Sequence, residues 1–262
     1  MPDRDVAYFA AWYADMGHVP DKDRLWTTVL GLPPHVLSTS ALTGAALDEV
    51  AGILGLCPGD VLLDLACGRA GYGLELAARS GARLVGLDFA EPAIVQARRN
   101  ARTLGLDDRA DLRVGDMTAT GLAPASVSAV LCVDAAQFPA DFRATFAEAH
   151  RVLVPGGVAV FTGWEARVPD DPAASERIRR VDLAAGLRSA GFTQVEVRSR
   201  EDWLAAEQAA WRAVVALPAS EDPATRSLQA EGRRSIERGD VYRRVLGVGR
   251  RAVRNGLRKP TP

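Results

Sequence analysis

Two acidic residues end apolar runs in the first half of the chain and enclose a turn of small residues. Asp64 lies in the apolar run that starts at Val61, and Asp88 ends a second run about 20 residues beyond the turn, the spacing at which nucleotide-binding sheets hold a ribose hydroxyl pair. Between them lies the turn from Ala66 to Gly71. A backbone with small side chains can approach a ligand closely, and the free N–H groups of the helix that follows favour a carboxylate or another anion. These residues predict a bound nucleoside over the strand ends.

The turn departs from the pattern that binds a dinucleotide. A nicotinamide dinucleotide site uses G-x-G-x-x-G so that glycine N–H groups can reach the pyrophosphate. This turn instead has Ala66, Gly68 and Ala70, and the Asp64 carboxylate stands at its mouth. Because a carboxylate repels a pyrophosphate, the residues favour a nucleoside that carries no phosphate.

Four segments resemble motifs of the class I S-adenosylmethionine-dependent methyltransferases that act on small molecules, and they occur in the same order as in that family. Asp64 and the following turn resemble an acid followed by G-x-G-x-G, and Asp88-Phe89 begins a segment similar to the family's next motif. Gly115-Asp116-Met117 is similar to a G-D-[AM] element, and the segment from Arg151 to Gly157 resembles R-x-L-x-P-G-G. The resemblance extends from about Ala51 to Arg251.

The resemblance implies S-adenosylmethionine as the cofactor. This ligand has a cationic amino-acid end and no phosphate, which suits Asp64. Phe89 is expected to pack on the adenine, and Asp116 to accept a hydrogen bond from its exocyclic amine. The cofactor-binding residues that the resemblance implies are Asp64, Ala66, Gly68, Asp88, Phe89, Asp116, Met117 and Cys132.

The candidate catalytic residues are Gln137, His35 and Asp134. A sulfonium methyl group is already electrophilic, so the enzyme has to align an acceptor and, for a hydroxyl or an acidic carbon, remove a proton. His35 and also His18 could act as bases because the pKa of histidine lies near neutrality. The place of Gln137 resembles a site that is occupied by histidine in many members of the family. Because glutamine cannot act as a base, the residue favours catalysis by positioning of the acceptor. No metal ion is implied.

The order of the expected elements predicts an α/β fold with a Rossmann-like, mostly parallel sheet whose last strand is antiparallel. Ligands bind at the carboxyl ends of such strands. The expected parts are an N-terminal helical cap (1–50), a cofactor-binding core (51–200), a helical insertion that acts as a lid (201–239), and the last strand with a basic tail (240–262). The cap and the insertion are expected to close a chamber for a small organic substrate. The strands and helices expected in the core are Val61 to Leu65, Tyr72 to Arg79, Arg83 to Leu87, Ala93 to Leu104, Ala110 to Val114, Val127 to Val133, Phe142 to Leu153, Val158 to Gly163, a helix from Arg179 to Ala190, and a strand from Thr193 to Val197.

The amino-acid composition is typical of a soluble enzyme. The chain has a net charge of -1 and 48% hydrophobic residues, with no apolar run near the 18 or so residues that a membrane helix needs. Its start, MPDRD, gives no secretion signal, and three cysteines without C-x-x-C spacing fit buried thiols in the cytoplasm. Arginine pairs occur near the C-terminus, but the chain as a whole lacks the basic charge that nucleic-acid binding requires, so no nucleic-acid partner is expected. Whether the chain forms a homodimer stays open.

The function predicted from the sequence is methyl transfer from S-adenosylmethionine to an oxygen, nitrogen or carbon atom of a small molecule, in specialised metabolism. The main alternative is a protein with the same cofactor pocket that catalyses a cyclisation or rearrangement without methyl transfer. A nicotinamide-dependent oxidoreductase and a binding module without catalysis are further alternatives.

Overall fold

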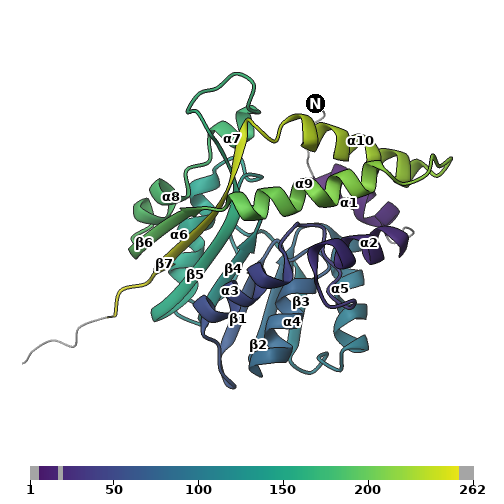
Figure 1. The fold of residues 1–262 in the computed structure, drawn as a ribbon. Helices are drawn as coiled ribbons and strands as arrows, with labels where there is room; N and C mark the ends of the chain where they lie inside the picture. The colour runs from purple at the N-terminus through teal and green to yellow at the C-terminus, as the bar shows by residue number, and fades with distance from the viewer. Residues whose placement is uncertain (1–5, 17–19, 254–262) are drawn as a thin grey trace, which may run out of the picture.

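A seven-stranded sheet forms the centre of the computed structural model, which describes residues 6–16 and 20–253 (Figure 1). The strand order is β3-β2-β1-β4-β5-β7-β6. Strands β1 to β5 pair in parallel with one another, whereas β7 lies between β5 and β6 and is antiparallel to both. The strands are β1 (Val61–Leu65), β2 (Arg83–Asp88), β3 (Ala110–Val114), β4 (Val127–Val133), β5 (Leu153–Ala166), β6 (Thr193–Ser199) and β7 (Tyr242–Arg250). The predicted Rossmann-like sheet with an antiparallel last strand is confirmed.

Helices cover both faces of this sheet because its central strands are apolar on both sides. In β4, Ala129 and Leu131 belong to the cluster that includes α3, α4 and α5, whereas Val130 and Cys132 belong to the cluster that includes α6 and α8. This alternation follows from the two-residue period of a strand. The helices are α1 (Val6–Met16), α2 (Pro20–Leu30), α3 (Gly44–Leu54), α4 (Gly71–Ser80), α5 (Glu91–Thr103), α6 (Phe142–Val152), α7 (Glu176–Arg179), α8 (Leu183–Ser189), α9 (Glu201–Val215) and α10 (Pro223–Glu237).

The structure differs from the sequence predictions in three elements. The helix expected from Arg179 to Ala190 is the shorter α8, and a separate helix, α7, precedes it and ends at Arg179. They separate at Asp182, which has an extended backbone and whose side chain accepts a hydrogen bond from the backbone N–H of Ala185, so it caps a new helix. Strand β5 begins at Leu153 rather than at Val158. Helix α2, from Pro20 to Leu30, had not been predicted, and its first residues are charged rather than apolar.

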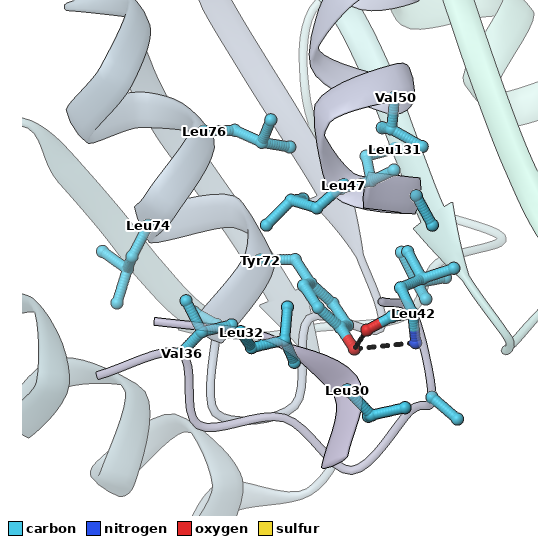
Figure 2. Close-up of a cluster of buried hydrophobic side chains, with 14 of the residues drawn as sticks. Leu30, Leu32, Val36, Leu42, Leu47, Val50, Tyr72, Leu74, Leu76 and Leu131 are labelled. Atoms are coloured by element: carbon cyan, nitrogen blue, oxygen red, sulfur yellow. Dashed lines mark hydrogen bonds between the residues drawn. The ribbon is translucent and has the colours of Figure 1, made fainter. Parts of the chain in front are cut away.

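The N-terminal segment shares its hydrophobic core with the sheet and α4 (Figure 2). Leucine and valine side chains from residues 30–50 surround Tyr72 of α4. The Tyr72 hydroxyl accepts a hydrogen bond from the backbone N–H of Leu42 at 3.0 Å and donates one to the carbonyl oxygen of Ser40 at 2.9 Å. This buried contact fixes the N-terminal segment against the helix that follows the turn after β1.

Helices α9 and α10 cross above the carboxyl ends of the central strands, where Figure 1 shows them as a pair near α1 and α2. Trp26 of α2 and Trp211 of α9 meet edge to face, with ring centroids 5.0 Å apart. This contact joins the N-terminal helices to the segment before the last strand. The division of the chain into four parts at residues 50, 200 and 239 stays a prediction.

None of the helices within residues 6–16 and 20–253 has the length and apolar character that crossing a membrane requires.

The contact between the N-terminal segment and α4 can be tested at Gly71, the first residue of α4. A Cβ atom there would lie 2.6 Å from the carbonyl oxygen of Leu37, so Gly71→Ala should lower the free energy of unfolding by about 1–3 kcal/mol. Gly52→Ala in α3 is the matched control, since nothing lies within 4 Å of that position, and it should raise stability by about 0.5–1 kcal/mol. Urea denaturation measures both. Equal stability of Gly71→Ala and the unsubstituted protein would contradict this close contact.

Candidate active site

A cavity of about 250 Å³ lies between the carboxyl ends of the strands and the helices above them. Helices α1, α7, α9 and α10 all contribute to its wall, as do the residues that follow β1, β2 and β4. A smaller cavity of about 20 Å³ adjoins it at the turn after β1, and Ala66 lines both. We call the larger cavity the chamber and the smaller one the side cavity.

The turn after β1 has a tightly fixed backbone. The Gly68 N–H donates to Asp88 Oδ2 at 2.9 Å, and the Cys67 N–H donates to the carbonyl oxygen of Leu87 at 2.9 Å. Ala66 and Ala70 have φ of 54° and 58°, values at which alanine is strained by about 1–2 kcal/mol. These are positions where the resembling family has glycine, so the chain keeps the turn geometry at a cost in stability.

Asp88 is positioned by backbone donors and faces the chamber. Its Oδ1 accepts from the Ala90 N–H at 2.9 Å, while Oδ2 accepts from Gly68. Each carboxylate oxygen can accept a further hydrogen bond. Asp88 can therefore hold a pair of hydroxyl groups at the end of β2.

Asp64 lines the side cavity, and its surroundings disfavour the ionised form of its carboxyl group. Burial, and then the nearby charge of Asp88, raise the pKa of Asp64 to about 8. A cationic group bound in the side cavity would reverse this effect, since opposite charge favours the ionised carboxyl. The site is thus suited to a positively charged ligand group.

Aromatic residues of α1 close the chamber over the turn. Phe9 meets the rings of Phe89 and Phe138 edge to face, with centroids 5.6 and 5.0 Å away. Tyr13 lies so close to the turn that a Cβ atom on Gly68 would be 2.5 Å from its hydroxyl oxygen. Glycine at position 68 therefore leaves the space that Tyr13 occupies.

Asp134 is held in a buried ion pair. Its Oδ2 accepts from Arg244 Nη1 at 2.9 Å, and its Oδ1 accepts from the Thr162 hydroxyl at 2.7 Å. Arg244 is 0% exposed and lies over the Trp164 ring at 4.4 Å. Gln137 lies next to this pair, and its Nε2 donates to the carbonyl oxygen of Asp134 at 2.7 Å. Both Asp134 and Gln137 line the chamber.

Glu207 of α9 is a chamber residue that sequence reasoning missed. Its Oε2 accepts from the Trp164 indole N–H at 3.0 Å, and its Oε1 accepts from the Trp211 indole N–H at 3.3 Å. Burial raises the pKa of Glu207 above its usual range. The spacing of Trp203, Glu207 and Trp211, four residues apart on one helix, was a signal that could have found it.

The structure brings together most, but not all, of the residues predicted for the site. Ala66, Asp88 and Phe89 line the chamber with Asp134 and Gln137. The side cavity is lined by Asp64, Ala66 and Gly68. The remaining predicted residues, which line neither cavity, are His35, Asp116, Met117 and Cys132.

All four have other contacts in the structure, and Met117 is buried in the same hydrophobic cluster as Cys132. His35 Nε2 lies 2.6 Å from Glu75 Oε2 of α4, and its side chain is 42% exposed. Asp116 is exposed and accepts hydrogen bonds from the N–H and hydroxyl of Thr118. Cys132 is buried within β4 and packs against the helices of the α6 face. Their roles in binding or catalysis stay predictions, and His18 lies outside the described residues.

The strand order and the flanking helices define a Rossmann-like α/β protein, with two adjoining cavities at the carboxyl ends of its strands. Two solved structures share this fold. The 4+2 cyclase SpnF aligns with a TM-score of 0.71 and 20% identity over 90% of this chain and 94% of that one. Phosphoethanolamine N-methyltransferase 2 of Haemonchus contortus, in complex with S-adenosyl-L-methionine, aligns with a TM-score of 0.72 and 16% identity over 88% of this chain and 56% of that one.

Sequence comparison identifies the family of the central domain. Residues 62–157 match the methyltransferase domain family. The chain is 32% identical to 24-methylenesterol C-methyltransferase 2 of Oryza sativa subsp. japonica over 147 residues, which are 54% of this chain and 40% of that protein. This chain thus spans less than half of that relative's length. Residues 62–157 form a methyltransferase domain of the class I S-adenosylmethionine-dependent type.

The raised pKa of Asp64 predicts a pH-dependent stability. The unfolded chain releases this proton near pH 3.8, whereas the folded protein keeps it up to about pH 8. The folded state binds more protons within this window, so the contribution of Asp64 to the free energy of unfolding falls as the pH rises. Asparagine does not titrate, so the stability of Asp64→Asn relative to the unsubstituted protein should be higher at about pH 8 than at about pH 5. Urea denaturation at the two pH values measures this difference.

Asp107→Asn, a substitution of an exposed acid, is the control and should show no such gain. A difference between Asp64→Asn and the unsubstituted protein that is the same at both pH values would contradict the assignment of a neutral Asp64.

Proposed function

We propose that the protein transfers the methyl group of S-adenosylmethionine to a small organic molecule bound in the chamber. The observation that carries this proposal is the turn that joins the two cavities. One backbone N–H of that turn fixes Asp88 at the chamber, and Asp64 lies behind the turn in the side cavity. For a nucleoside with a cationic amino-acid end, Asp88 would match the ribose hydroxyls and Asp64 would match the cationic end.

The residues present fit this cofactor. Asp88 would accept hydrogen bonds from the ribose hydroxyls, and Phe89 would pack against the adenine. The carboxyl of Asp64, whose pKa burial raises to about 8, would gain from the positive charge of the amino-acid end. The bound cofactor supplies an electrophilic methyl group.

The chamber residues would orient the acceptor toward that methyl group. The carboxylate of Asp134 is held by Arg244 and Thr162, and Gln137 is held by the Asp134 backbone. Rigid polar groups of this kind align a reactant without reorganising during the reaction. The aromatic residues of α1 and α9 exclude water, which would compete as an acceptor.

We propose carbon as the acceptor atom. The relative from Oryza sativa subsp. japonica is a C-methyltransferase, and the chamber has many aromatic walls that suit an apolar substrate. When a carbon gains the methyl group, the bond from carbon to methyl forms as the methyl–sulfur bond breaks, and the acceptor then releases a proton. Glu207 lines the chamber with a carboxyl whose pKa burial raises, so its carboxylate would accept that proton.

Methyl transfer is favoured over the cyclisation alternative. The cyclase SpnF shares the fold at 20% identity, and a fold alone does not determine a reaction. The sequence match of the central domain is to methyltransferases. The chamber is enclosed by helices on several sides, which suits a small molecule rather than a nucleic acid.

Cofactor binding can be tested at Asp88 by calorimetry. Asp88→Asn removes the charge that would accept from the ribose hydroxyls, so the affinity for S-adenosylmethionine should fall by about 10- to 100-fold. Asp108→Asn, which changes an exposed acid, should bind the cofactor as the unsubstituted protein does. Circular dichroism establishes that both variants are folded. Unchanged affinity of a folded Asp88→Asn would overturn the proposed ribose site.

Methyl transfer and the role of Glu207 can be tested together with methyl-labelled S-adenosylmethionine and a set of steroid and terpenoid alkenes. The unsubstituted protein should label an acceptor at carbon. Glu207→Gln keeps the size of the side chain and one acceptor oxygen for an indole N–H, but it cannot take up a proton, and it should lower kcat by about 100-fold or more while leaving cofactor affinity unchanged. Conversion of an acceptor without transfer of label would favour the cyclisation alternative. Equal kcat for Glu207→Gln would exclude Glu207 as the base.

A further inference from the structure

Helix α10 places two arginines on the wall of the chamber. Arg234 lies in the last turn of α10, Arg238 is the residue that follows the end of the helix, and both line the chamber. Arg177 of α7 lines the chamber as well, with its guanidinium 4.8 Å from the centre of the Phe138 ring. In Figure 1 the end of α10 comes close to α7. Three arginines, one on α7 and two at the C-terminal end of α10, thus line the chamber.

The side chains of Arg234 and Arg238 form no hydrogen bond or ion pair with any residue that the structure describes. Arginines near them have acidic partners. Arg243 donates to Glu165 at 2.7 Å, and Arg167 donates to Glu201 at 2.6 Å. Two cations without a counter-charge at one cavity wall make a favourable place for an anion.

The acids of the chamber are engaged elsewhere. Asp134 is paired with Arg244, and Glu207 accepts from two indole N–H groups. Glu231, also on α10, acts electrostatically on Lys22 of α2. The remaining chamber acid, Asp88, accepts from the turn after β1 and is assigned to the cofactor. The positive charge of Arg234 and Arg238 is therefore open to a bound ligand.

We propose that Arg234 and Arg238, together with Arg177, bind an anionic group of the substrate, a carboxylate or a phosphate. Guanidinium groups bind both anions through paired, charge-assisted hydrogen bonds. The aromatic side chains of the chamber would hold the apolar body of the substrate between this anion site and the strand ends. This inference rests on the proposed function for the identity of the reaction, but the anion site is testable without it.

The experiment uses three ring compounds of similar size: phenyl phosphate, phenylacetate and neutral benzyl alcohol. Binding is followed by tryptophan fluorescence, since four of the five tryptophans, Trp12, Trp26, Trp164 and Trp211, line the chamber. At least one anionic compound should bind about tenfold more tightly than benzyl alcohol, and its affinity should fall as salt is added. The stronger of phenyl phosphate and phenylacetate identifies which anion the site prefers.

The double variant Arg234→Ala/Arg238→Ala should lose this preference, with the affinity for the preferred anion reduced about tenfold or more. Arg233→Ala is the matched control, because Arg233 is an exposed arginine of the same helix that does not line the chamber. It should keep the preference. Equal binding of anionic and neutral compounds by the unsubstituted protein, or an unchanged anion affinity in the double variant, would overturn the proposal.

Calorimetry with S-adenosylmethionine separates this inference from the proposed function. The double variant should bind the cofactor with unchanged affinity, because neither arginine contacts the turn after β1. If the unsubstituted protein binds the anions but not the cofactor, the proposed function fails and the anion site stands. If it binds the cofactor but shows no preference for anions, the anion site fails and methyl transfer stands.

Discussion

The arrangement of the chamber depends on one buried guanidinium group. Arg244 of β7 is fully buried, donates to Asp134 beyond β4, and lies 3.5 Å from Glu207 of α9. Its guanidinium also lies over Trp164 of β5. Burying a charge without a counter-charge is very costly, so these four elements are held where the two carboxylates and the Trp164 ring compensate the charge of Arg244. Its Nε and Nη2 nevertheless have no hydrogen-bond partner among the described residues. Because β7 pairs with β5 in the antiparallel direction, Arg244 lies next to α9, and this contact fixes one wall of the chamber.

Segments from both ends of the chain complete the chamber around the strand ends. Tyr13 of α1 lies against the turn at Gly68, and Trp26 of α2 meets Trp211 of α9. The resulting cavity has acids near the strand ends and arginines on α10. This separation of charge gives the chamber a direction: a cationic cofactor is favoured at one part and an anionic group at the other. A substrate that spans the two would present a fixed atom to the methyl group.

Local patterns in the sequence predicted the centre of the fold and several of the residues that line the two cavities. The apolar strands before Asp64 and Asp88 and the turn at Gly68 depend on neighbours close in sequence, and the structure places them together at the strand ends. The break between α7 and α8 was missed, because a single capping residue, Asp182, outweighs a continuous helical pattern. Helix α2 was missed because its apolar residues are packed by α9, far away in sequence.

The sequence by itself determined the strand, the turn and the helix at which a nucleoside is proposed to bind, since strand period, turn residues and the placement of acids are local properties. The tertiary structure alone decided which side chains reach the chamber. It places His35 against Glu75 rather than at the cavity, and it brings Glu207 of α9 and Arg234 of α10 to the wall from a segment that the sequence marked only as a lid. The reason is physical: the direction of a side chain from a helix depends on which face packs, and that face is set by partners distant in sequence.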